Sequence, residues 1–124
     1  MVIEYNGDIA QVMRDDPDLD FVIPREGGIL ASDGLCIPRG APNPDLAYAF
    51  IDFVLGAQAG ADIARTIRYP TPNQAALALM PADYRDSKVI FPPAEALSRC
   101  EYSRYRGPEM NSRYEQAMTQ VRAG

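Results

Sequence analysis

The feature of this sequence that most limits its fold is a set of short apolar segments that have the pattern of β-strands but no partner nearby. Three runs have the length, apolar content and flanking turn residues of a buried strand, namely residues 2–5, 19–24 and 35–37. No two of them are joined by a hairpin turn. Because the backbone groups of a strand need hydrogen-bonding partners, we expect each run to pair with other strands of a larger sheet or with a second molecule.

The rest of the chain carries helical patterns. The clearest begins with Asn43 as N-cap and Pro44 at the first helical position, and its apolar residues recur at helical spacing as far as Gly56. Asn73 is a second predicted N-cap. The predicted helices cover residues 9–16, 43–55, 61–68, 73–79, 94–99 and 111–123, with a further turn at 81–84. Strands and helices together indicate an α/β fold.

The composition excludes several classes of function. The chain contains no histidine, which removes Ser-His-Asp and Cys-His catalysis and most zinc sites, and we predict neither a metal nor a cofactor. Acidic residues number 17 and basic ones 12, a net charge of −5 that disfavours nucleic acid and mildly favours a cationic partner, although it also suits plain solubility. No run approaches the ~20 apolar residues of a membrane span, so we predict no membrane insertion. Residues 1–12 lack the pattern of a signal peptide.

Several motifs are similar, in order and in spacing, to those of a known family of receptors. They are the runs Tyr5-Asn6-Gly7-Asp8, Pro24-Arg25-Glu26-Gly27-Gly28, Asp33 ahead of Leu35-Cys36-Ile37-Pro38, Asn43-Pro44-Asp45-Leu46-Ala47, Tyr69-Pro70-Thr71-Pro72-Asn73, Ile90-Phe91-Pro92-Pro93 and Val121-Arg122-Ala123-Gly124. Through these runs the whole chain resembles the C-terminal part of periplasmic spermidine/putrescine-binding proteins, the solute-binding components of ABC transporters. The most specific pattern is Y-P-T-P-N following a G-G-x-x-x-x-D segment.

The resemblance implies a partial type II periplasmic-binding-protein fold, the last third of an architecture of two lobes joined by a hinge. Residues 1–30 would belong to the C-terminal lobe, 31–78 to the N-terminal lobe with its crossover strands, and 79–124 to the C-terminal lobe again. It also implies a periplasmic location, a polyamine-like cation as the ligand, and an ABC permease as the partner of the full-length parent. Such a protein captures and delivers a solute, so we expect no enzymatic activity.

Four residues match ligand-binding positions of that family. Tyr5 stands where the family places an aromatic ring against the ligand's methylenes, and Asp8 where some members pair a carboxylate with an amine. Asp33 matches the most characteristic ammonium-binding carboxylate, and Tyr69 matches a cleft tyrosine that offers both ring and hydroxyl. Taken singly, each has a plainer local explanation, with the two tyrosines as an edge and a loop aromatic and the two aspartates as helix-start and turn residues.

Two positions depart from the family pattern. Ala31 stands where the family usually has Trp or Phe, which removes one wall of the aromatic box. Ser103 stands where spermidine receptors often carry a hydrogen-bonding Gln. The resemblance therefore implies a small cation without implying spermidine in particular.

Two other functions remain open on the sequence. One is an enzyme that uses paired carboxylates, such as Glu101 with Glu109, or Asp8 with Asp33. The other is a truncated orphan product that binds no ligand and whose main property is self-association.

The segments without partners also predict a homodimer. Apolar residues of the 43–55 helix, such as Phe50, and strand edges around Phe21 and Ile37 would be costly to leave exposed in a monomer. An intertwined dimer that exchanges elements near Gly27-Gly28 or Tyr69-Pro70 would cover them.

Overall fold

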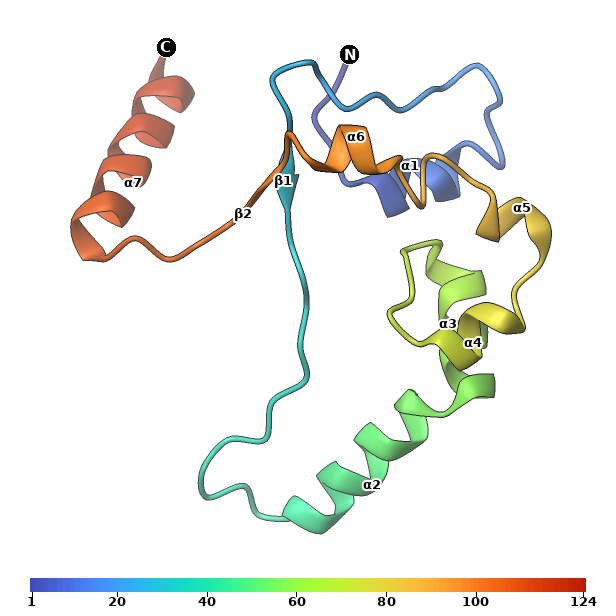
Figure 1. The fold of residues 1–124 in the computed structure, drawn as a ribbon. Coiled ribbons are helices and arrows are strands. Elements are labelled where there is room, and N and C mark those ends of the chain that lie inside the picture. Colours follow the sequence, from blue (N-terminus) through green and yellow to red (C-terminus); the bar gives the residue numbers. More distant parts are fainter.

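The computed structural model describes all 124 residues and contains seven helices and two very short strands (Figure 1). The helices are α1 (Asn6–Val12), α2 (Pro44–Leu55), α3 (Ala57–Ile67), α4 (Gln74–Ala78), α5 (Ala82–Arg85), α6 (Ala94–Leu97) and α7 (Pro108–Ala123). The strands are β1 (Ile29–Leu30) and β2 (Glu101–Tyr102), which pair in parallel with Ile29 opposite Glu101.

The predicted helices are confirmed, with differences at their ends. Pro44 opens α2, and Gly56, in an extended conformation, separates it from α3. Asn73 caps α4, since its side-chain oxygen accepts hydrogen bonds from the backbone N–H groups of Ala75 and Ala76 at 3.0 and 3.1 Å. The first helix ends earlier than predicted, at Val12, and the last begins earlier, at Pro108, because a proline is well suited to the first helical position.

The predicted strands are wrong. Residues 2–5, 19–24 and 35–37 form no strand, because no other segment of this chain pairs with them through a ladder of backbone hydrogen bonds. The two strands that do form were not predicted, since they depend on contact between distant parts of the chain. The backbone N–H of Glu101 donates to the carbonyl of Gly28 at 2.9 Å, and that of Ser103 donates to Leu30 at 3.1 Å.

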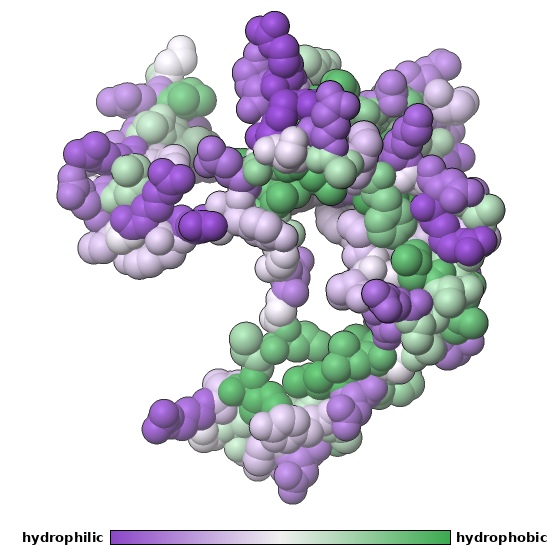
Figure 2. Space-filling model, viewed as in Figure 1, coloured by the Kyte–Doolittle hydropathy of each residue, from purple (hydrophilic) through white to green (hydrophobic).

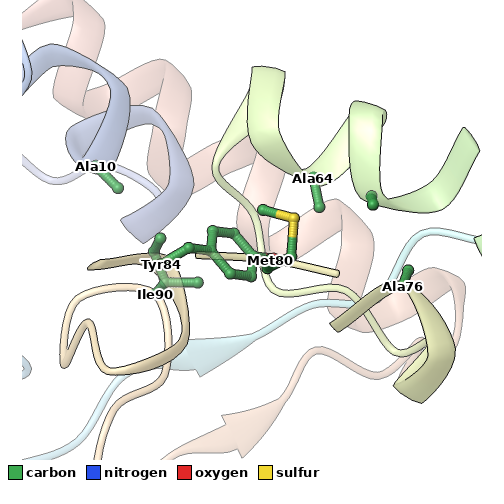
Figure 3. Packing of buried hydrophobic residues seen from close by; sticks show 7 residues of the cluster. Ala10, Ala64, Ala76, Met80, Tyr84 and Ile90 are labelled. Atoms are coloured by element: carbon green, nitrogen blue, oxygen red, sulfur yellow. The ribbon is translucent and has the colours of Figure 1, made fainter. Parts of the chain in front are cut away.

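The core is small and lies where α3 packs against α1 and α4 (Figure 3). Its buried members are mostly alanines and a few larger residues, namely Ala10, Ala61, Ala64, Ala76, Met80, Tyr84 and Ile90. Small side chains let the helices approach closely. A Cβ added to Gly60 on α3 would lie 3.2 Å from the Cβ of Ala76 on α4, for example.

Tyr84 on α5 joins this core to the loop that follows α3. Its ring is fully buried and meets the ring of Phe91 edge to face, with centroids 5.4 Å apart. Its hydroxyl donates to the carbonyl of Tyr69 at 2.6 Å and accepts from the N–H of Thr71 at 3.0 Å. Burial raises the pKa of Tyr84, so this hydroxyl keeps its proton at physiological pH. One side chain therefore sets the position of the 69–72 loop.

Most of the chain outside this core is exposed to solvent. The chain exposes 10191 Å², whereas a compact protein of its mass exposes about 6,600 Å². Figure 1 shows why: α7 stands apart from the body, and α2 is connected to it only through α3 and the extended segment after β1. In Figure 2 an apolar stretch over α2 borders an opening through the molecule.

Helix α2 is apolar on nearly every side. Its only charged residues are Asp45 and Asp52, yet none of its residues is buried, and Phe53 is 69% exposed. A helix with this pattern normally lies inside a larger protein. No single helix of the chain has the length and apolar content of a membrane span; α2 and α3 have them only together, and they are bent by 71° at their junction.

The Tyr84 hydroxyl gives a first prediction. Tyr84→Phe should leave the carbonyl of Tyr69 and the N–H of Thr71 without partners and destabilise the fold by about 1 to 3 kcal/mol. Hydrogen exchange followed by NMR should show the Thr71 amide exchanging at least tenfold faster. Tyr114→Phe, on the exposed face of α7, is the matched control and should leave that rate unchanged. Equal exchange in both variants would show that another contact holds the loop.

Candidate functional site

Three of the four predicted site residues meet at the start of α1. Tyr5 is the residue immediately before the helix, Asp8 lies in its first turn, and Tyr69 reaches them from the loop after α3. The ring of Tyr69 lies directly over Gly7, where an added Cβ would come within 2.1 Å of the ring. Only glycine allows this approach, so Gly7 in the Y-N-G-D motif is explained by packing.

Both sides of this contact are fixed by the core. On one side, the Asn6 side-chain amide donates to the carbonyls of Val89 and Ile90 at 2.9 and 3.3 Å, which ties the start of α1 to the segment before α6. On the other side, Tyr84 holds the carbonyl of Tyr69. The position of the Tyr69 ring therefore follows from buried contacts, although the ring itself is only partly buried.

The electrostatics of the site favour a positive ligand. Burial, a hydrogen bond with Asp8, and the negative charges of Asp8 and Glu4 together raise the pKa of Tyr69 to about 12. The Tyr69 hydroxyl is thus a hydrogen-bond donor in a negative environment. We refer to Glu4, Tyr5, Asp8 and Tyr69 as the Tyr69 cluster.

Asp33 is not part of this cluster. It lies in the extended segment between β1 and α2, is exposed, and is not among the charged groups that raise the pKa of Tyr69. Ala31 lies exposed in the same segment, and Ser103 lies just after β2. The structure brings Tyr5, Asp8 and Tyr69 together, and the ligand-binding roles of all four residues, Asp33 included, remain predictions.

Two residues of the site were missed in the sequence. Glu4 adds a second carboxylate, and its side chain accepts a hydrogen bond from the N–H of Tyr5 at 3.0 Å. Its position next to Tyr5 was a usable signal. Tyr84 positions Tyr69 from 15 residues away, and no local pattern indicates such a contact.

The cluster brings together carboxylates and aromatic rings, the groups that attract a cation. Two carboxylates and two rings can surround an ammonium group, with the ring faces adding cation–π attraction. No group of three or more Cys, Asp or Glu side chains lies close enough to hold a metal ion. Both cysteines are free.

Comparison with known proteins identifies the family. A family model of bacterial extracellular solute-binding proteins matches residues 1–92. The chain is 33% identical to the putrescine/cadaverine-binding protein of Pseudomonas aeruginosa over 94% of this chain and 34% of the relative. It is 34% identical to the spermidine/putrescine-binding periplasmic protein of Escherichia coli over 97% of this chain and 34% of the relative. The chain thus spans about a third of the length of these relatives.

A solved structure supports the same assignment. The spermidine/putrescine ABC transporter substrate-binding protein of Streptococcus pneumoniae superimposes with a TM-score of 0.57 at 28% identity, over 69% of this chain and 27% of that protein. The predicted fold class, part of a periplasmic-binding-protein fold, is confirmed by this likeness. Since the family model matches well over half of its residues, the chain belongs to the family of bacterial extracellular solute-binding proteins.

Proposed function

We propose that the chain is part of the solute-binding component of an ABC-type uptake system for a polyamine-like cation, acting in the periplasm with an ABC permease as its partner. The observation that carries this proposal is the Tyr69 cluster, in which an aromatic ring and two carboxylates surround the start of α1. The relatives support it, because the names of two of them include putrescine.

Each part of the cluster has a role in this function. The carboxylates of Asp8 and Glu4 attract an ammonium group, and a charge-assisted hydrogen bond contributes about 1.5 to 3 kcal/mol. The rings of Tyr5 and Tyr69 pack against methylenes and attract the ammonium, for about 0.5 to 2 kcal/mol. The Ala31 and Ser103 departures argue for a small diamine over spermidine.

The lobe division remains part of the proposal. Residues 1–30 and 79–124 would form one lobe and residues 31–78 the other. The cluster lies across that boundary, because Tyr69 belongs to the second range and Asp8 to the first. A ligand-binding cleft between lobes is expected at such a place. We propose that Asp33, from the crossing segment, supplies a further carboxylate when the cleft closes.

The alternatives have less support. The family is one of solute-binding proteins and not a class of enzymes, so paired-carboxylate catalysis has nothing in its favour beyond residue type. The alternative that the chain binds no ligand has no support from these relatives, whose names state that they bind putrescine and related amines.

We also propose that this chain on its own forms a homodimer. It exposes about 3,600 Å² more than a compact protein of its mass, and an obligate homodimer interface buries about 2,000 to 5,000 Å² in total. The 69–72 loop is held by Tyr84, which argues against exchange at Tyr69-Pro70. The extended linker before α7, with Gly107 at φ 91°, is a better place for a swapped element.

Light scattering on a size-exclusion peak tests the dimer. We expect a mass of twice 13.6 kDa, and removal of α7 by truncation after Ser103 should convert the dimer to monomer or aggregate. A cooperatively unfolding 13.6 kDa monomer would contradict the proposal.

The pKa of Tyr69 tests the cluster. In the unfolded chain a tyrosine ionises near pH 10, and in the fold Tyr69 ionises at about 12. The protonated phenol therefore contributes stability that is complete below pH 10 and is lost as the pH rises to 12. Asp8→Asn should lower the pKa of Tyr69 part of the way toward 10, since burial remains as a cause. Spectrophotometric titration at 295 nm, with Tyr69→Phe to assign the transition, measures this.

The control for that titration is Asp45→Asn, on exposed α2, which should leave the transition in place. If Asp8→Asn leaves the transition where it is, the Asp8 carboxylate does not raise the pKa of Tyr69, and the Tyr69 cluster is wrong as described.

Ligand binding is best measured in a protein that has both lobes. Replacing the matching third of the Escherichia coli relative with this chain provides one, and calorimetry should show that it binds putrescine. Asp33→Asn should weaken that binding about tenfold or more, because losing a charged partner costs over ~1.4 kcal/mol. Asp45→Asn should have no effect. The 124-residue chain alone should bind more weakly than micromolar, since a cleft ligand needs both walls.

A further inference from the structure

Arg68 occupies a backbone conformation that an arginine has no intrinsic reason to adopt. It ends α3 with φ 58° and is the only non-glycine residue of the chain with a positive φ. Glycine is the usual residue at such a helix end, because it takes the left-handed conformation without strain, whereas a residue with a Cβ is strained there. Backbone strain at a residue other than glycine suggests that its side chain makes contacts that offset the strain.

The Arg68 side chain is held in place but leaves most of its donors unused. It is only 15% exposed, and its guanidinium carbon lies 5.7 Å from the centre of the Tyr84 ring. Nη1 donates to Asp83 at 3.1 Å. A guanidinium has five N–H donors, and this is its only hydrogen bond within the chain. Nε is buried and has no partner.

A cavity of about 120 Å³ lies beside this side chain. Its lining residues come from α1 and the two residues after it, from the residue that follows α3 and from the segment after α5, and they are Ala10, Met13, Arg14, Arg68, Ser87 and Val89. The space is large enough for several water molecules or for a small group such as a carboxylate or a phosphate.

The charge of this cavity is opposite to that of the Tyr69 cluster. Two of its six lining residues are arginines and none is acidic, in a chain whose net charge is −5. Asp83, the one carboxylate paired with Arg68, is itself 67% exposed. The Ser87 hydroxyl accepts a hydrogen bond from the N–H of Ile90 at 3.3 Å, which leaves its own proton free to donate. Three side chains that can donate hydrogen bonds, two of them cationic, thus line the cavity, and no acidic side chain does.

We propose that this cavity is a second binding site, specific for a small oxyanion such as a carboxylate or phosphate. Arg68 and Arg14 supply the positive charge, and Ser87 supplies a hydroxyl donor. Ala10, Met13 and Val89 form an apolar side that accepts a short alkyl group. The site shares no residue with the Tyr69 cluster, and it does not depend on the polyamine proposal.

NMR of the 124-residue chain tests the site, because the Nε–H of Arg68 gives its own signal in an ¹H–¹⁵N spectrum. Sodium acetate and sodium phosphate are titrated in turn at constant ionic strength, with sodium chloride as the balance. We expect a saturable shift of the Arg68 Nε–H and of the Ala10 and Val89 amides, with a midpoint in the millimolar range. The anion whose titration has the lower midpoint, acetate or phosphate, is the one that the site prefers.

Arg68→Gly separates binding from folding, because glycine fits the left-handed conformation better than arginine does. The variant should keep its dispersed spectrum and lose the Ala10 and Val89 shifts. Arg14→Gln, which changes an exposed residue, should raise the midpoint at least threefold. Arg65→Ala, on α3 but outside the cavity, is the matched control and should behave like the unmodified chain. Shifts that persist in Arg68→Gly, or that rise linearly without saturation, would overturn the proposal.

Discussion

The arrangement of this chain depends on the buried hydroxyl of Tyr84. It accepts one hydrogen bond from the 69–72 loop and donates another to it, while its ring fills the centre of the small core. A buried hydroxyl is favourable only when it is satisfied, so the loop and the core stabilise each other. Because Tyr69 belongs to that loop, a residue with no contact to ligand sets the position of the ring that we assign to binding.

Helix α1 carries opposite charges at its two ends, and each end contributes to a different proposed site. Asp8 lies in its first turn, where the helix dipole favours a negative charge, and Arg14 follows its last turn, where a positive charge is favoured. The cation cluster and the oxyanion cavity therefore share one short helix. The packing of Ala10 in the core holds that helix in place.

The chain exposes a large surface because its core is small. Alanine-rich packing around α3 buries few large side chains, and α2, apolar on nearly every side, is left uncovered. A helix that is apolar on every side normally lies inside a larger protein. This agrees with the match to the Streptococcus pneumoniae relative, of which this chain covers only 27%. The same exposure underlies the proposed self-association, since apolar surface that finds no cover within a chain drives contact between chains.

The sequence by itself determined the helices and the family. Caps and prolines act within a few residues, so Pro44, Gly56 and Asn73 mark helix ends wherever the rest of the chain lies. The motifs likewise brought Tyr5, Asp8, Asp33 and Tyr69 forward as candidate ligand-binding residues. Only the tertiary structure decided which segments became strands, that Asp33 lies apart from Tyr69, and that Arg68 borders a cavity. Strand pairing and long-range contacts depend on what lies alongside a segment in space, and the pattern of residues within the segment carries no information about that neighbour.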